Sequence, residues 1–305
     1  MRNTVLTQTC ALFTASALLA ATPAFAAPIV PGTSGTSYTY DAANKTYFVS
    51  GNTLLNADIS GTDLYVGKSN VSPYSTLGGT ATLTVGAGAV ATRTVPNVDL
   101  AGYGINTYGA FHTNVSGGNI ANLFGEDASV TTITGGAINL AVLFNSASLS
   151  LSGGAVTFLA LGEAGTAEVT TAAISGGVFT NLTLTANSTA TITGGIVPTV
   201  DGSGVYLYDT GARANLYGNG LAATYIGLNA NGYDVFNVTG TLNDGTVYTP
   251  SAPLPVGIRS TTNVPNSTPR QFSLNNPAVV PEAGTLAFAT IGLAGGAGLA
   301  RRKRK

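Results

Sequence analysis

The chain has 305 residues, of which 8% are charged and 44% hydrophobic, with 40 glycines and no tryptophan. This composition excludes a disordered chain, is untypical of a cytosolic enzyme, and favours an all-β body punctuated by glycine. Of the 12 basic residues, Arg2 and residues 301–305 account for six; of the 13 acidic residues, only Glu282 lies outside 27–280. Residues 27–280 therefore carry 6 basic and 12 acidic groups, a net charge of −6, which excludes nucleic acid as a partner.

The N-terminal segment 1–26 is typical of a secretory signal peptide. Arg2 precedes an apolar stretch over 11–21, and small residues follow it. The small residues around the predicted cleavage site are Ala24, Ala26 and Ala27. Cys10 is the single cysteine, so cleavage would leave a mature chain without disulfides or cysteine-ligated metals. The alternative is an N-terminal membrane anchor that is not cleaved, although the apolar stretch is shorter than a spanning helix requires.

A Ser/Thr-Gly-Gly motif recurs through the middle of the chain. It begins at positions 116, 134, 152, 175 and 193, so the repeat period is 18 except for one interval of 23 between 152 and 175. Between the motifs apolar residues alternate with small polar ones, as at Leu149 and Leu151 among serines. This alternation is typical of a strand with one buried face.

A unit this short cannot bury its own apolar face, so such units must stack to form a core. We therefore predict that residues 27–248 form an all-β, right-handed parallel β-helix, with the clearest repeats over 116–200. The glycine pairs belong at corners, where a positive φ or a close backbone approach excludes a Cβ. The five extra residues of the long unit are expected in a turn around 162–165. A β-sandwich would show turns at shorter spacing without this regular period.

The two ends of the stack need caps, because exposed strand edges would pair with another chain. We assign these roles to residues 46–55 and 233–248, with a hairpin turn at Asp244-Gly245. Seven of the 13 prolines then fall between Pro250 and Pro281. We predict that residues 249–280 form an extended, proline-rich linker.

The C-terminal segment from residue 281 contains an apolar stretch followed by positive charges. Residues 285–300 are apolar and predict a transmembrane helix of about 24 Å, slightly shorter than the ~30 Å hydrocarbon core of a membrane. With the body exported, the basic residues would remain in the cytoplasm, so the membrane is an expected partner. The alternative is a buried core helix.

The sequence Val280-Pro281-Glu282, the apolar stretch and the basic end together resemble the PEP-CTERM sorting segment of exported bacterial proteins. In that family an exosortase-type protease in the membrane is thought to recognise the segment. The resemblance implies that residues 281–305 form the segment, with Pro281 and Glu282 as the sorting signal. It also implies a membrane stop formed by Arg301, Arg302, Lys303, Arg304 and Lys305. Ala283 departs from the pattern, because the family usually has a second proline there.

Few residues suggest catalysis or metal binding. His112 has no acidic neighbour in sequence, and the Asp58/Asp63 pair is most simply explained by solvated turns. Glu126, Asp127, Glu163 and Glu168 could converge if neighbouring units stack, as a glycosidase or polysaccharide lyase would require. We expect no bound metal, no cofactor and no enzymatic activity. A glycosidase or polysaccharide lyase on the same fold is kept as an alternative.

Tyrosines recur in the last units, at residues 206, 208, 217, 225 and 233. They could stack on sugars of an exopolysaccharide, which makes a glycan-binding surface module a second alternative; packing against the cap is the simpler interpretation. The expected function is that of an exported structural or adhesive protein. We expect it to be anchored in the cell-envelope membrane before processing, and then to lie at the cell surface or in the extracellular matrix.

Overall fold

The computed structural model describes residues 26–70, 75–91, 104–163, 167–198, 203–229, 232–259 and 272–276, and within them it is all-β. This confirms the predicted fold class at that level. Across these ranges no helix is long and apolar enough to span a membrane. The signal peptide up to residue 25 and the sorting segment 281–305, with its predicted transmembrane helix 285–300, lie outside the described residues.

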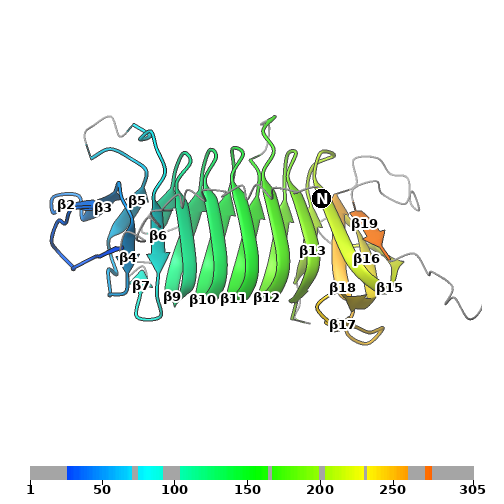
Figure 1. The fold of residues 1–305 in the computed structure, drawn as a ribbon. Helices are drawn as coiled ribbons and strands as arrows, with labels where there is room; N and C mark the ends of the chain where they lie inside the picture. Colours follow the sequence, from blue (N-terminus) through cyan, green and yellow to red (C-terminus); the bar gives the residue numbers. More distant parts are fainter. Residues whose placement is uncertain are drawn as a thin grey trace, which may run out of the picture.

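The middle of the molecule is a stack of parallel strands (Figure 1). Its members are β9 (His112–Gly125), β10 (Val130–Leu143), β11 (Ser148–Leu161), β12 (Thr171–Leu184) and β13 (Thr189–Ile196). Each strand pairs in parallel with the next one along the chain. Ile133 pairs with Leu151 and Leu143 with Leu161, so the repeat period of the sequence is the register of the stack.

Each long strand bends and so contributes to three faces. Face A is formed by the first four residues of each strand, such as 130–133 and 148–151. Face B is formed by the short middle part, such as 137–138, and face C by the last four residues, such as 140–143. Residues of the three faces alternate between the interior and the surface, as their burial pattern shows.

The Ser/Thr-Gly-Gly motif forms the bend between faces A and B. A Cβ on Gly135 would lie 2.4 Å from the Ser116 carbonyl oxygen, and Gly136 has a φ of +85°. The ladder shifts register here, and the Thr134 hydroxyl donates to the Val115 carbonyl oxygen of the preceding unit at 3.3 Å. The prediction that glycine pairs occupy corners is confirmed. The Thr134 hydroxyl gives the Val115 carbonyl oxygen a hydrogen-bond donor at the point where the strand pairing shifts register.

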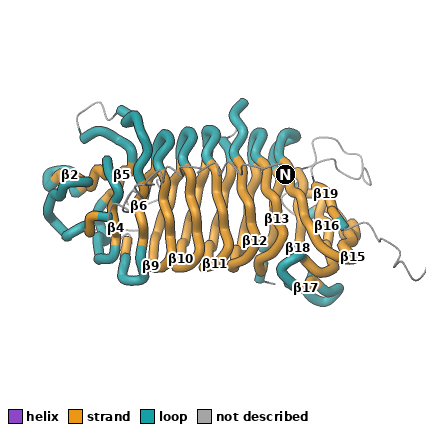
Figure 2. The backbone as a smooth tube through the Cα atoms, viewed as in Figure 1, coloured by secondary structure: helices purple, strands orange, loops and turns teal. Residues whose placement is uncertain are grey.

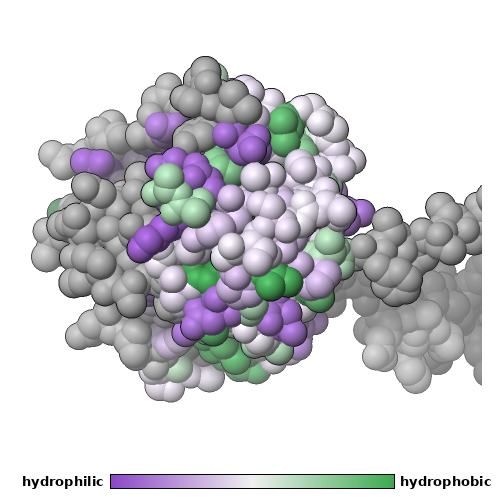
Figure 3. All heavy atoms as spheres, turned by 90° about the vertical axis from the view of Figure 1, so that its left-hand side faces the viewer, coloured by the Kyte–Doolittle hydropathy of each residue, from purple (hydrophilic) through white to green (hydrophobic). Residues whose placement is uncertain are grey.

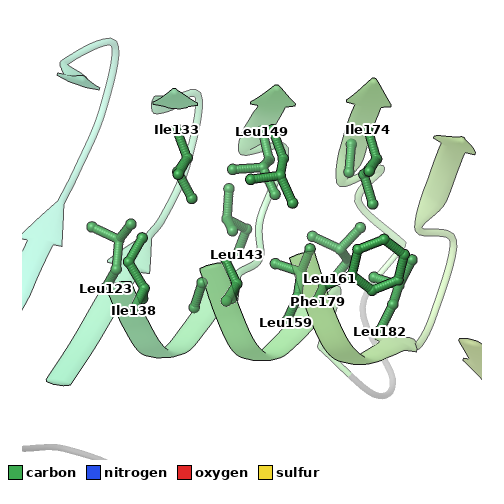
Figure 4. Close-up of a cluster of buried hydrophobic side chains, with 14 of the residues drawn as sticks. Leu123, Ile133, Ile138, Leu143, Leu149, Leu159, Leu161, Ile174, Phe179 and Leu182 are labelled. Atoms are coloured by element: carbon green, nitrogen blue, oxygen red, sulfur yellow. The ribbon is translucent and has the colours of Figure 1, made fainter. Parts of the chain in front are cut away.

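The core is a set of aliphatic columns that run through the stack. Ile133, Leu151 and Ile174 form one column on the inner side of face A, and all three are buried. Figure 4 shows Ile133, Leu149 and Ile174 facing residues of the other faces, including Leu143 and Leu182, across the interior. Each fully buried Leu or Ile contributes roughly 1.5–3 kcal/mol of hydrophobic stabilisation.

The extra residues of the longest unit lie in one turn, as predicted. Leu161 pairs with Leu184, and Ser148 pairs with Thr171. The insertion is therefore confined to residues 162–170, between face C of one unit and face A of the next. Turns at this position line up along one edge of the stack (Figure 2).

The N-terminal end continues the same faces with shorter strands. These are β1 (Ala27–Pro28), β2 (Tyr38–Asp41), β3 (Thr46–Val49), β4 (Thr53–Leu55), β5 (Asp63–Val66), β6 (Thr82–Val85), β7 (Val90–Ala91) and β8 (Ile105–Thr107). The predicted cap over 46–55 is wrong, because β3 and β4 pair in parallel with β5 and β6 and belong to the stack. The antiparallel β2 pairs with β3 instead. Figure 3 shows hydrophilic and weakly polar residues over much of the coloured part of this end.

The C-terminal end contains β14 (Gly204–Leu207), β15 (Arg213–Leu228), β16 (Tyr233–Leu242), β17 (Val247–Tyr248), β18 (Leu254–Arg259) and β19 (Phe272–Asn275). β16 is antiparallel to β15, β17 and β18, as expected of a cap. Gly245 has a φ of +90° in the β16–β17 turn, which confirms the predicted hairpin.

The linker prediction for 249–280 is wrong where the structure describes that segment. β18 extends face C by pairing with β14, and β19 extends face A by pairing with β15. Leu254, Val256 and Ile258 are buried. These three residues alternate with Pro255 and Gly257, which is the strand pattern, and Pro253 immediately precedes the strand. The prolines therefore do not prevent a strand.

Candidate functional site

Three of the four predicted carboxylates lie along the same edge of the stack, between faces C and A. Glu126 and Asp127 lie in the turn after β9, and Glu163 lies in the turn after β11. The negative charges of Asp127 and Glu163 both act on Glu126. Glu168, at the far end of the inserted turn, instead accepts a hydrogen bond from the Ser146 hydroxyl at 3.2 Å.

Two residues that the sequence analysis did not single out, Tyr108 and Lys68, also act on Glu126. The Tyr108 hydroxyl is hydrogen-bonded to the Glu126 carboxylate, and the Lys68 ammonium lies 4.1 Å from the centre of the Tyr108 ring. Tyr65 also packs against Tyr108, with ring centres 6.1 Å apart. Tyr108 lies one repeat period before Glu126 in the sequence, so extending the period one unit upstream would have placed the two together.

Burial governs the protonation of this group of residues. It raises the pKa of the Glu126 carboxyl, and the Lys68 charge and the hydrogen bond from Tyr108 offset part of that effect. Burial, followed by the Glu126 charge, raises the pKa of the Tyr108 phenol. A half-buried carboxyl with a hydrogen-bond donor and a nearby cation is a stable arrangement, and chemically it could also transfer a proton.

The other predicted acid–base or metal residues stay apart. Asp58 accepts a hydrogen bond from the Ser60 amide at 2.8 Å, while Asp63 is the first residue of β5. His112 lies on the outer side of face A, between Thr82 and Val130 in the register. No three His, Cys, Asp or Glu side chains of the described residues are close enough to hold a metal ion.

The tyrosines of the C-terminal end divide into packed and exposed ones. Tyr233 is buried, with its ring centre 5.7 Å from that of Tyr206 and 5.3 Å from that of Tyr208. Burial, then the hydrogen bond to Tyr208, raises the pKa of Tyr233. Tyr225 packs on Phe236 at 5.2 Å. These contacts support the packing interpretation for Tyr206, Tyr225 and Tyr233.

An open groove of about 440 Å³ lies between the end of β13 and the β16–β17 hairpin. It is lined by Ile196, Val197, Pro198, Thr246, Val247, Tyr248 and Ala252. Ile196 and Val247 are 52% and 60% exposed. The Tyr248 hydroxyl already accepts a hydrogen bond from the Val197 amide and donates one to the Gly195 carbonyl oxygen. The groove therefore offers apolar contacts and contains none of the residues predicted from the sequence.

Of the residues predicted for export and sorting, two lie within the described part of the chain. Ala27 is the first residue of β1, and its amide donates to the Asn52 carbonyl oxygen at 3.1 Å; Ala26 immediately precedes it. Ala24, Pro281, Glu282 and the basic residues 301–305 lie outside the described residues. The first described strand thus starts at the residue predicted to begin the mature chain.

No protein-family model, no curated protein and no solved structure matches this chain.

Proposed function

We propose that this protein is an exported structural or adhesive protein of the cell surface or extracellular matrix, without enzymatic activity. The observation that carries the proposal is a continuous stack of parallel strands whose first described strand starts at Ala27, the residue after the predicted signal peptide. Stacked units of this kind produce an elongated body with extended flat faces, which suits a spacer or an adhesive surface.

We propose further that the body is a right-handed parallel β-helix. Successive parallel strands of one sheet are joined by crossover connections, and the twist of strands makes such connections right-handed in nearly all cases. The registers of faces A and C, each running from the N-terminal strands to β19 or β18, support this topology.

The chain ends give the route in this proposal. The signal peptide exports the body, residues 285–300 hold it in the cell-envelope membrane, and an exosortase-type protease recognises Pro281 and Glu282 before release to the surface. The basic residues 301–305 remain on the cytoplasmic side and prevent complete transfer. Because Asn276 is bonded to the backbone of Leu221, only the short stretch after it separates the body from this segment.

The Glu126 cluster fits a structural role within this proposal. The carboxylate interacts with Tyr108 and Lys68, residues of other turns, and so links three units along one edge of the stack. A hydrogen-bonded, partly buried carboxyl contributes to stability only when its partners are in place.

Fractionation of cells with antibodies against the body and against residues 290–305 tests the sorting proposal. We expect a full-length chain in the membrane fraction and a shorter chain, without the tail signal, at the surface or in the medium. Glu282→Gln should accumulate the full-length membrane form, whereas Glu163→Gln, a matched change in the body, should be processed normally. A full-length soluble chain in the cytoplasm would contradict the proposal.

A further inference from the structure

Face A carries two columns of outward-pointing side chains that are rich in hydroxyl groups. In register order the first column is Thr82, His112, Val130, Ser148, Thr171, Thr189 and Arg213. The second column is Thr84, Asn114, Thr132, Ser150, Ala173, Thr191 and Asn215. From β6 to β13 the columns cover six units, or about 24 Å at the ~4.8 Å separation of paired strands.

The hydroxyl groups of these two columns have no hydrogen-bond partner among the described residues. They belong to Thr82, Thr84, Thr132, Ser148, Ser150, Thr171, Thr189 and Thr191, and none of them makes a hydrogen bond within the part of the chain that the structure describes. The hydroxyls of the adjoining corner differ, because Ser116, Thr134 and Thr193 each donate to a backbone carbonyl of the preceding unit. The columns therefore present free donors and acceptors at regular intervals.

Face A is also electrically neutral along most of its length. Between His112 and Arg213 the two columns contain no ionisable residue, and Arg213 turns its guanidinium toward the Thr210 and Ala212 carbonyl oxygens. Among the described residues no acidic group belongs to these columns, and Glu126, Asp127 and Glu163 lie in turns at the edge of the stack. A charged polymer would gain nothing from this face, and an anionic one would be repelled by the body.

The outer side of face C, built from the same strands, has a different chemistry. In register order over β9 to β12, one column is Phe124, Val142, Ala160 and Thr183, and the other is Asn122, Leu140, Phe158 and Asn181. Apolar side chains therefore occupy most of these positions, and only one of the eight carries a hydroxyl group. Strand formation alone does not require hydroxyl groups on one face and apolar groups on the next, because threonine and β-branched or aromatic apolar residues all favour strands. The difference concentrates hydrogen-bonding capacity on face A.

We propose that face A is a binding surface for an uncharged, extended polysaccharide, which lies against the hydroxyl columns and exchanges hydrogen bonds with them. Hydroxyls donate and accept, so they match the hydroxyls of a neutral glycan in either direction. The neutral surface suits a neutral polymer, and its length fits several sugar units. This inference names the adhesive partner and rests on the proposed surface location.

Co-sedimentation of the full-length chain, kept in solution with detergent, with insoluble neutral glycans tests the proposal. The probes are a β-linked glucan, an α-linked glucan and a mannan, with the anionic polymer polygalacturonate as the contrast. We expect retention on at least one neutral glycan, no retention on polygalacturonate, and affinity that is unchanged between low and high salt, because no charge is involved.

Variants then locate the surface. Ser150→Glu on face A should abolish retention, whereas Thr157→Glu, an exposed position of the same strand β11, should leave it unchanged. Replacing both Ser148 and Ser150 with alanine removes two hydroxyls without adding charge and should weaken binding about tenfold. Equal unfolding midpoints of the variants exclude loss of the fold as the cause.

Failure to bind any of the neutral glycans, or equal loss with Ser150→Glu and Thr157→Glu, would overturn the inference. So would a change of oligomeric state by Ser150→Glu in sedimentation velocity without glycan, since the face would then bind a second copy. A surface-located chain that binds no glycan overturns this inference alone. A cytoplasmic chain that binds glucan through Ser150 overturns only the proposed location.

Discussion

The middle of the stack and its C-terminal end are stabilised in different ways. In the middle, from β9 to β13, each unit pairs with the units directly before and after it, usually one repeat period away along the chain. At the C-terminal end the contacts span much longer separations. The Tyr248 hydroxyl reaches Val197 and Gly195, 51 and 53 residues earlier, and Asn276 reaches Leu221, 55 residues earlier.

This difference indicates two kinds of folding. The middle is close to one-dimensional, because a unit is stabilised by its neighbours and by its own repeated sequence. The C-terminal end must close long loops before its contacts form, which costs chain entropy. β18 is the last described strand of face C, and the antiparallel β16 pairs with its outer edge, so the end also covers that edge of the stack.

The largest loss of folding stability is expected from Leu254→Ala in β18, where the side chain is fully buried. The cavity and the lost transfer energy should cost about 3 kcal/mol, within the ~2–5 kcal/mol range of such changes. If the end is a separate cooperative unit, hydrogen exchange should accelerate in β16 and β18 and remain slow in β10 and β11. Uniform acceleration throughout the stack would remove the distinction between the two regions.

A smaller loss of folding stability is expected from Gly153→Ala in β11, in the middle of the stack. The added Cβ would lie 2.4 Å from the Thr134 carbonyl oxygen, which is backbone and cannot move aside without shifting a unit. We expect a loss of about 2 kcal/mol in urea unfolding, as for overpacked cores. Gly78→Ala is the matched control, because its Cβ would meet no atom within 4 Å. Equal effects of the two changes would contradict the close-approach explanation.

Tyr248→Phe tests the long-range hydrogen bonds of the end. The hydroxyl accepts from the Val197 amide at 3.1 Å and donates to the Gly195 carbonyl oxygen at 3.0 Å. Leaving both groups unpaired should cost about 1–2 kcal/mol. Tyr217→Phe, at an exposed tyrosine, should cost nothing measurable. A neutral result for Tyr248→Phe would show that the end does not depend on this link.

The smallest effect is expected from the pH dependence of Glu126. Burial raises its pKa in the folded chain, so its contribution to stability is complete below the ordinary glutamate pKa and is lost as pH rises through the raised value. Glu126→Gln should remove this loss, seen in urea midpoints measured as the pH rises above the ordinary glutamate pKa of about 4.3. Asp41 has the opposite sign, since its hydrogen bonds with Asn44 lower the pKa of its carboxyl. Asp41→Asn should therefore remove a loss of stability on the acid side.

The candidate residues were predictable to different degrees. The convergence of Glu126, Asp127 and Glu163 follows from the repeat period, and so does the contact of Tyr108 with Glu126. Lys68 was not predictable, because the units before residue 112 vary in length and their register cannot be counted from the motif. The hydroxyl columns of face A were visible only as small polar residues, since a single strand does not show which hydroxyls the backbone uses.

The sequence by itself determined the all-β class, the register of the repeats, the glycine corners, the place of the insertion and the Asp244-Gly245 hairpin. Each of these depends on a local pattern that repeats or on the conformational freedom of glycine. Only the tertiary structure decided that β3 and β4 belong to the stack and that residues 254–259 and 272–275 return to close faces C and A. Those outcomes depend on which distant strand edge is left to be paired, and the identity of that edge is a property of the whole stack.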